Sequence, residues 1–387
     1  MPFDPIVFAR LLKPISRRRF SASVARHDAD AYDKNFSSWD HLVALVFAQL
    51  SGAGSLRGLE AGWAANGHHH YHLGAGRIVR STLSDASGRR PVAVFEDTFS
   101  DLARLAGRQM RRVSEQLVQL IDSSPIPLGT LHTGRAFNGR IKGAKLHLVY
   151  DPQADIPQVA GITPANVNDI TFAHTVPVQL GAVYVFDKGY CSLSLWQKIH
   201  DAGAVFVTRP KANAAFETVG LNDIHPADNA NIIADEIVYH RSKNTWRGTL
   251  DFHMRRLTVR RDDGKLLQII TNDLTRSASD IAGLYRKRWQ IELLFRWIKQ
   301  HLKIRRFLGR SENAVKLQIY AALIAYLLLR LAARLARRED IQPIRFAELA
   351  AASLFFRKPI EHIDKPSSCR RQILSHNPKQ MSLKLNS

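Results

Sequence analysis

The stretch DIAGLYRKRWQIELLFRWIKQHLKI (residues 280–304) decides how the rest of the chain is interpreted. At 3.6 residues per turn it predicts one helix with an apolar, core-facing stripe. That stripe consists of Leu284, Ile291, Leu294, Phe295, Ile298 and Leu302. The opposite side, within an arc of about 60°, carries Tyr285, Arg288, Glu292 and Lys299, with Arg296 and Lys303 beside them. The pattern predicts a buried helix that presents one carboxylate among cations and a tyrosine.

The charge on this helix exceeds what its single acid can pair. Mixed charges on a helix are usually exposed residues that pair at one-turn spacing, and that interpretation stays open for Glu292. The cations around Glu292 are Arg286, Lys287, Arg288, Arg296, Lys299, Lys303, Arg305, Arg306 and Arg310. The whole chain has 55 Lys and Arg against 34 Asp and Glu, a net charge of +21. A folded chain of this charge predicts a polyanionic partner, and double-stranded DNA is the leading candidate.

Cysteine content and hydropathy indicate in which cellular compartment the protein is expected. The two cysteines, Cys191 and Cys369, supply neither a disulfide framework nor a cysteine-based metal site. The apolar N-terminal stretch is too short and too soon interrupted for a signal peptide. The apolar segment Ile319–Leu329 falls short of the roughly 20 residues that cross a bilayer. We therefore expect a soluble, cytoplasmic protein with no membrane partner, in which Ile319–Leu329 forms a core helix.

Changes in hydrophobic period divide the chain. Residues 1–105 contain short helical stretches broken by glycine, which predict a helical N-terminal DNA-binding domain. Residues 106–210 and 273–345 follow the order strand, strand, strand, helix, strand, helix, strand, long helix. That order predicts an α/β catalytic domain with a ribonuclease-H-like mixed sheet. Residues 211–272 are predicted as a β-rich insertion into it, and residues 346–387 as a basic C-terminal tail.

Three acids are the candidate catalytic residues. Asp122 and Asp187 each follow an apolar strand, at the sheet edge where α/β proteins place their ligands. Glu292, from the helix described above, could complete the set. An Asp at a strand end is often only a turn former or a helix cap, and that alternative applies to each aspartate alone. Three carboxylates favour a hard cation, Mg²⁺ with Mn²⁺ as a substitute, and two such ions can promote phosphodiester displacement.

The spacing Tyr–(2)–Arg–(3)–Glu–(6)–Lys of Tyr285, Arg288, Glu292 and Lys299 resembles a known signature. It is that of the IS-four family of DDE transposases from bacterial insertion sequences. The likeness covers most of the chain and includes IDSSPIPL (121–128), VFDKGY (185–190) and LGRSENAVKLQI (308–319). The chain departs from the family at Ser124, where Thr is common, and at Asn168-Asp169, where His-Asp is expected. Residues 131–140 are also less aromatic and less basic than in the family.

The resemblance implies a role for each matched residue. Asp122, Asp187 and Glu292 would hold the metal ions. Tyr285, Arg288 and Lys299 would grip DNA phosphates near the end of the element, with Arg296 and Lys303 extending the cationic face. Family members also stack a flipped base on an aromatic residue of the insertion. Trp246 is the only tryptophan of the insertion here, so it is the candidate.

The expected function is therefore cut-and-paste DNA transposition. The protein would bind terminal inverted repeats and target DNA, pair two ends as a homodimer, and catalyse metal-dependent hydrolysis and strand transfer. The family implies that excision passes through a DNA hairpin. One alternative is a catalytically inactive DNA-binding repressor or a decayed transposase, which would need none of the three acids. Another is a zinc hydrolase built on His68, His69, His70 and His72, although no carboxylate or cysteine lies at ligand spacing from them.

Overall fold

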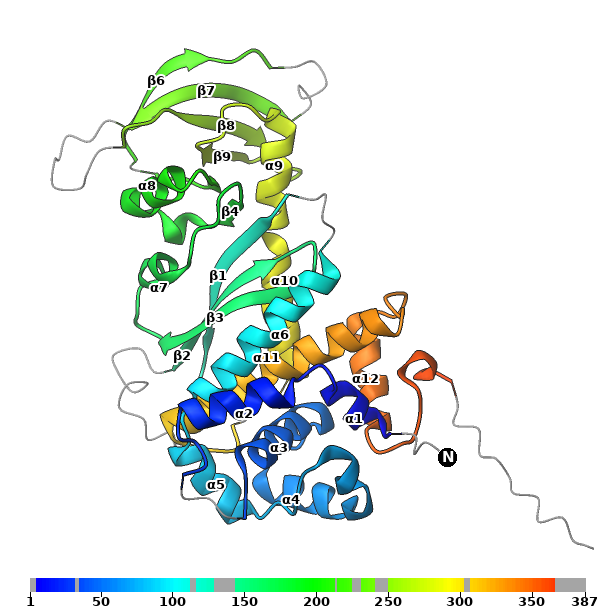
Figure 1. The fold of residues 1–387 in the computed structure, drawn as a ribbon. Coiled ribbons are helices and arrows are strands. Elements are labelled where there is room, and N and C mark those ends of the chain that lie inside the picture. The colour runs from blue at the N-terminus through cyan, green and yellow to red at the C-terminus, as the bar shows by residue number, and fades with distance from the viewer. Residues whose placement is uncertain are drawn as a thin grey trace, which may run out of the picture.

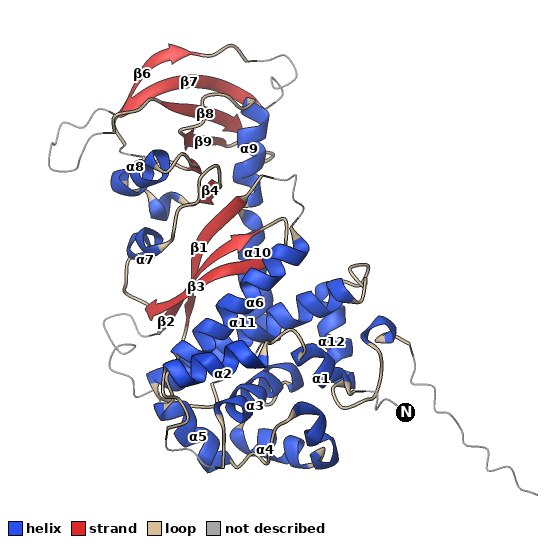
Figure 2. Ribbon diagram, in the orientation of Figure 1, coloured by secondary structure: helices blue, strands red, loops and turns tan. Residues whose placement is uncertain are grey.

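The computed structural model describes residues 5–31, 35–111, 116–128, 143–212, 214–224, 231–240, 250–302 and 307–365 (Figure 1). A helical part and a sheet-containing part lie end to end (Figure 2). The helices of the first 110 residues are α1 (Val7–Leu12), α2 (Arg17–Arg26), α3 (Ser38–Ser51), α4 (Leu56–Ala64), the 3₁₀ helix η1 (Gly67–Leu73), α5 (Arg80–Arg89) and α6 (Ala93–Met110). Several start where a serine hydroxyl accepts a hydrogen bond from a backbone N–H of the first turn, as at Ser16, Ser37 and Ser55.

In the described residues, nine strands form one mixed sheet in the order β3-β2-β1-β4-β5-β9-β8-β7-β6. The first five are β1 (Val118–Ile126), β2 (Ala144–Asp151), β3 (Ile156–Pro164), β4 (Val183–Phe186) and β5 (Val205–Thr208). Pairing is antiparallel between β3, β2 and β1, and parallel between β1, β4 and β5. The connections β3 to β4 and β4 to β5 run through α7 (Asp169–Thr175) and α8 (Leu193–Asp201). The predicted order of strands and helices is confirmed in this part of the chain.

Both faces of this half of the sheet are covered. Successive side chains of a strand point to opposite faces, and β4 shows this directly. Val183 and Val185 belong to one buried cluster with α6, α10 and α11, whereas Tyr184 and Phe186 belong to a second with α7 and α8. The sheet therefore has one face covered by α10 and one covered by α7. Alternate residues of a strand point to alternate faces.

The segment predicted as a β-rich insertion contains β6 (Phe216–Leu221), β7 (Ile232–His240), β8 (Met254–Arg260) and β9 (Leu266–Thr271). These strands pair antiparallel with one another, and β9 pairs antiparallel with β5. The insertion thus extends the catalytic sheet rather than forming a separate layer. From β9 the chain enters α9 (Ala278–Lys287) and α10 (Trp289–His301), followed by α11 (Glu312–Leu335), α12 (Pro343–Ser353) and the 3₁₀ helix η6 (Ile360–His362).

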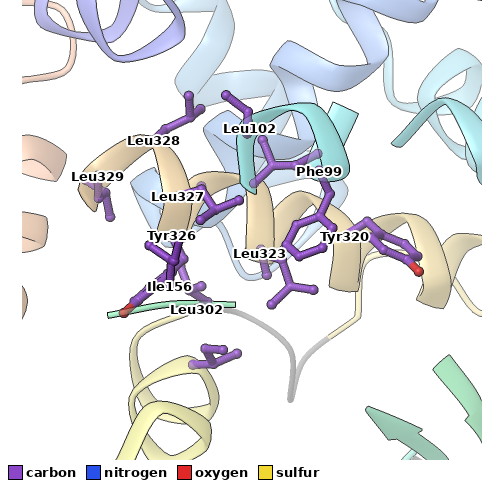
Figure 3. Close-up of a cluster of buried hydrophobic side chains, with 14 of the residues drawn as sticks. Phe99, Leu102, Ile156, Leu302, Tyr320, Leu323, Tyr326, Leu327, Leu328 and Leu329 are labelled. Atoms are coloured by element: carbon purple, nitrogen blue, oxygen red, sulfur yellow. The ribbon is translucent and has the colours of Figure 1, made fainter. Parts of the chain in front are cut away.

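Helix α11 is the centre of the core. Its length and composition would allow it to cross a membrane, but 89% of its most apolar window is buried inside the protein. Figure 3 shows Leu323 and Leu327 of α11 beside Phe99 and Leu102 of α6. Such packing on several sides explains an almost uninterrupted apolar run in a helix that is hydrophobic all round. The prediction of a core helix at Ile319–Leu329 is confirmed.

The same packing changes the predicted domain division. The boundary at residue 105 falls inside α6 (Ala93–Met110). Helix α11, from the predicted catalytic domain, packs against α3, α5 and α6 and shares one continuous buried cluster with them. The apolar faces of the first 110 residues are therefore buried in part by a helix from the far end of the chain.

The predicted C-terminal tail is wrong for residues 346–365. Phe346, Ala350 and Leu354 recur every four residues, and this helical spacing buries all three against the core. The backbone N–H groups of Val7 and Phe8 donate to the carbonyls of Phe356 and Leu354, at 3.0 and 2.9 Å. This segment therefore belongs to the folded core, and residues 366–387 lie outside the described residues.

Candidate active site

The register of β1 and β4 brings the two predicted catalytic aspartates together. Their last parallel pair is Ile121 with Phe186, so Asp122 and Asp187 are the next residues on adjacent strands. Asp187 directly follows β4, as predicted. Asp122 does not end its strand, because β1 continues to Ile126 by antiparallel pairing with β2. The Ser-Ser-Pro sequence after Asp122, whose residue types favour a turn, is strand for that reason.

The helix that carries Glu292 is broken rather than continuous. Helix α9 ends at Lys287 and α10 begins at Trp289, with Arg288 between them. The N–H of Arg288 donates to the carbonyl of Tyr285, three residues earlier, which is tighter than an α-helical bond. The two helices still form one column that passes behind β1 (Figure 1). The predicted apolar stripe is confirmed, since each of its members is buried: Leu284, Ile291, Leu294, Phe295, Ile298 and Leu302.

Side chains of α9 and α10 reach the acids of the sheet. Tyr285 Oη donates to Asp187 Oδ1 at 3.3 Å. Arg288 Nη1 lies 2.6 Å from Glu292 Oε1, one turn further along. Within the described ranges no three carboxylate, imidazole or thiolate groups are arranged as a closed metal site, and Glu292 is paired with Arg288 instead.

The structure describes two of the four remaining predicted DNA-binding residues. Lys299 is half-buried on α10 and Arg296, on the same helix, is exposed to solvent. Lys303 and Trp246 lie outside the described residues. The structure therefore brings Asp122, Asp187, Tyr285, Arg288 and Glu292 to one side of the sheet.

Electrostatics single out Asp122. Burial raises the pKa of its carboxyl group to about 6, and the negative charges of Glu292 and Asp187 act in the same direction. The N–H of Ser123, 2.8 Å from Asp122 Oδ1, and the charge of Arg288 oppose that rise. Repulsion among three neighbouring carboxylates is what a divalent cation relieves, and carboxylate oxygens are the donors that Mg²⁺ prefers. The donor set fits a hard divalent cation.

A cavity adjoins the acids between the insertion and α9. Its volume is about 450 Å³, and Tyr285 and Arg288 form part of its wall. The other cations of its lining come from different elements: Arg209 after β5, Arg260 and Arg261 at the end of β8, and Arg286 on α9. Trp289, 51% exposed, also lines the cavity, and Asp262 and Asp263 add two carboxylates to a lining in which arginines are in excess. Positive charge beside the acids favours an anionic ligand there.

Sequence reasoning missed a polar cluster behind Asp122. Ser123 Oγ and Lys145 Nζ both donate to Asp169 Oδ1, at 2.8 and 3.0 Å. Asp169 is the first residue of α7, capped by Asn168. The Asn168-Asp169 pair stood out in the sequence as a departure from the family, but no local pattern linked Lys145 of β2 to it.

The histidine cluster does not form a metal centre. The His70 ring stacks on Trp63 at 4.1 Å between centroids, and His70 Nε2 lies 3.0 Å from the Trp63 carbonyl oxygen. His69 stacks on Phe355. In the part of the chain that the structure describes, no group of three potential metal ligands involves these imidazoles. Their packing against aromatic rings gives the zinc hydrolase hypothesis no support.

Comparison with known families assigns the catalytic half of the chain. Residues 113–328, more than half of the sequence, match the family model described as "Transposase DDE domain". The chain belongs to the DDE transposase family. Residues 4–76 match a second family model, described as a domain of unknown function (DUF4372). The predicted resemblance to DDE transposases is thus confirmed.

Individual proteins that are similar to this chain in sequence are also named as transposases. The chain is 50% identical over 286 residues to a protein of Sinorhizobium fredii named as transposase y4zB, covering 73% of this chain and 80% of that one. It is 28% identical over 268 residues to a protein of Geobacillus stearothermophilus named as a transposase of insertion sequence element IS5377, covering 66% and 68%. A solved piggyBac transposase synaptic complex with hairpin DNA aligns over 96% of this chain and 84% of that chain, with a TM-score of 0.45 and 9% identity.

The transposase is therefore an enzyme of DNA cleavage and strand transfer, the reactions that the DDE family catalyses. The family acts on DNA and normally uses divalent metal ions. The similarity to insertion-sequence transposases does not favour the alternative of a non-catalytic repressor.

Proposed function

We propose that this transposase is of the IS-four type and moves its own insertion sequence by cutting at the element ends. The Tyr285, Arg288, Glu292 and Lys299 spacing supports that subgroup. The strand order β3-β2-β1-β4-β5, antiparallel as far as β1 and parallel from β1 to β5, supports a ribonuclease-H-like catalytic domain. The observation that carries the proposal is the β1–β4 register, which makes Asp122 and Asp187 neighbours, with Glu292 electrostatically coupled to Asp122.

The three carboxylates would hold the divalent cations, Mg²⁺ or Mn²⁺ in its place. Bound there, the metal ions would activate the attacking hydroxyl and stabilise the leaving oxygen of a phosphodiester. Asp122 and Asp187 are set on neighbouring strands of a rigid sheet, which keeps their separation constant. Glu292 enters from α10 and must leave Arg288 to join them.

The cations beside the acids would bind the DNA backbone. Arg288 is half-buried between Glu292 and Tyr285, so its guanidinium is held for a bidentate phosphate contact. Burial raises the pKa of Tyr285 to about 12, so its hydroxyl keeps its proton and remains a donor at neutral pH. Lys299 and the exposed Arg296 continue the cationic surface along α10.

The DNA partners would be the terminal inverted repeats and the target duplex, bound by a homodimer that pairs two ends. The net charge of +21 supports a long contact with nucleic acid. The helical N-terminal part would contribute to end binding, since Arg18 and Arg26 of α2 are exposed. Hydrolysis would leave a 3′-hydroxyl at the element end, which then attacks target DNA, with a hairpin as the expected route of excision.

The experiment is cleavage of a labelled duplex that contains the element end, in Mg²⁺, by the wild type and by Glu292→Gln. We expect cleavage at the element boundary by the wild type and none by the variant, with equal binding of the duplex in a gel-shift assay. Binding without cleavage by the wild type, in either Mg²⁺ or Mn²⁺, would contradict the proposal.

A further inference from the structure

A polar cluster lies on the α7 face of the sheet, directly behind the strand that carries Asp122. Residues alternate across a strand, so Asp122 faces α10 and the next residue, Ser123, faces α7. The Ser123 hydroxyl donates to Asp169 Oδ1 at 2.8 Å, and Lys145 Nζ donates to the same oxygen at 3.0 Å. These three side chains come from β1, β2 and the start of α7.

Ser123 connects this cluster to the acid on the other face. Its backbone N–H donates to Asp122 Oδ1 at 2.8 Å, while its side chain donates to Asp169. A single residue therefore makes both hydrogen bonds, one on each side of the strand. The hydroxyl and the peptide N–H of Ser123 thus link the Asp169 carboxylate to the Asp122 carboxylate.

The neighbours of the cluster hold Asp169 firmly. Lys145 Nζ also donates to the Val167 carbonyl at 2.8 Å, which fixes the loop before α7. His147 is fully buried, with Nε2 2.8 Å from Thr163 Oγ1 and Nδ1 3.7 Å from Asp169 Oδ1. Burial lowers the pKa of His147 to about 4, so it is neutral at physiological pH and Lys145 supplies the counter-charge.

Stability alone is a weak reason for this arrangement. The side chains of Lys145 and Asp169 are only 16% and 27% exposed. At such burial the cost of removing two charges from water consumes most of the Coulomb attraction. One turn further along α7, Phe172 places an aromatic ring in a stack on His147. Because stability does not explain this charged pair, its place directly behind the strand that carries Asp122 makes it a candidate for a role in the site.

We propose that Asp169, Ser123 and Lys145 form a positioning network that orients the Asp122 carboxylate and thereby sets the affinity of the site for its divalent cation. The inference rests on the proposed function, in which Asp122 is a metal ligand. None of the three residues needs to touch the metal or DNA. Outer partners of this kind typically change metal affinity by about 10- to 100-fold when they are removed.

The test is Mn²⁺ binding to the full-length chain, measured by electron paramagnetic resonance of the free ion, for Asp169→Asn and Ser123→Ala. Each variant is expected to raise the Kd for Mn²⁺ about tenfold. The double variant should bind no more weakly than the weaker single one, because the two residues act in series. The Mg²⁺ concentration that half-saturates cleavage should rise by the same factor, and cleavage at saturating Mg²⁺ should change less.

Two control variants separate the explanations. Asp155→Asn removes the same charge from a comparable network on the β2–β3 turn and should leave Mn²⁺ binding unchanged. Asp122→Asn should abolish binding. If Asp122→Asn weakens Mn²⁺ binding but Asp169→Asn and Ser123→Ala bind as the wild type does, the positioning network is refuted and the proposed function stands. If Asp122→Asn itself binds like the wild type, the proposed metal site is wrong. Should Asp169→Asn fail to fold, Ser123→Ala, which keeps the Lys145–Asp169 pair, decides the question.

Discussion

The carboxylates of Asp155 and Asp122 lie on the same sheet. They differ in the hydrogen-bond donors and the charges that surround them. In the turn between β2 and β3, Asp155 Oδ1 accepts hydrogen bonds from Tyr150 and Tyr326 at 2.6 and 2.8 Å, and Arg330 lies 2.9 Å from Oδ2. At the end of the β1–β4 pairing, Asp122 has one backbone N–H at 2.8 Å, the nearby charge of Arg288 and two neighbouring carboxylates. The Asp155 cluster joins α11 to the sheet, whereas the carboxylates around Asp122 repel one another.

The two acids differ in how their surroundings compensate the negative charge. Asp155 has three donors and opposite charge, so its anion is stabilised where it stands. Asp122 is buried beside two like charges, and burial is the main cause of its raised pKa, which the charge of Arg288 and the Ser123 N–H only partly oppose. An unsatisfied group of acids persists in a folded protein when a ligand supplies the missing charge. The comparison therefore predicts opposite consequences for the same chemical change at the two places.

The largest effect is expected for Asp122→Asn. Removing a ligand of the proposed metal site should lower the rate of element-end cleavage by at least about 10²- to 10³-fold, the range seen when one electrostatic stabiliser of a transition state is lost. Because the same change removes a buried negative charge, whose burial raises the pKa of Asp122 despite the nearby charge of Arg288, the metal-free variant should be at least as stable as the wild type at neutral pH. Cleavage assays and thermal unfolding in EDTA measure both quantities. A less stable variant with normal cleavage would reverse the assignment of the two clusters.

A smaller effect, on stability alone, is expected for Asp155→Asn. The amide cannot form the ion pair with Arg330, and its NH₂ group places a donor against that guanidinium. Leaving a half-buried charge unpaired should cost about 1–3 kcal/mol of unfolding free energy. Urea denaturation measures this, with Glu339→Gln as a control, because that acid forms a more exposed pair with Arg334. An unchanged midpoint would show that the Asp155 cluster does not stabilise the fold.

The smallest expected effect is on the pH dependence of stability, which again distinguishes Asp122 from Asp155. Because the pKa of Asp122 is raised to about 6 in the folded chain, folding favours its protonated form. Its contribution therefore makes the metal-free protein less stable as pH rises from about 4 to about 6, the window between its unfolded and folded pKa values. Protons compete with the metal in the same range, so Mn²⁺ affinity should fall by up to about tenfold per pH unit below 6.

Thermal unfolding in EDTA at several pH values, for the wild type and Asp122→Asn, checks this dependence. The two curves should converge at about pH 4 and separate towards pH 7, with the wild type less stable at pH 7. Asp155→Asn is the matched control and should keep the pH dependence of the wild type. Parallel curves for wild type and Asp122→Asn would show that Asp122 is not perturbed.

Much of the fold follows from local pattern. The six apolar residues at helical spacing between Leu284 and Leu302 are all buried, and the alternation of strands and helices before residue 210 is the one observed. The spacing of apolar residues predicts such features, because the repeat of a helix or a strand depends only on backbone geometry. Boundaries were less predictable: Ser-Ser-Pro after Asp122 suits a turn, yet pairing with β2 makes it strand. The C-terminal segment containing Phe346 was obscured by its polar, basic surroundings.

By itself, the amino-acid sequence determined the class of protein and supplied the three acids as candidates, because residue type, spacing and net charge are local properties of the chain. Only the tertiary structure decided which groups meet. The β1–β4 register made Asp122 and Asp187 neighbours, packing of α10 on the sheet brought Glu292 near Asp122, and α7 brought Asp169 behind the strand that carries Asp122. Burial and proximity set the charge state of a carboxylate, and both depend on chain segments far apart in sequence.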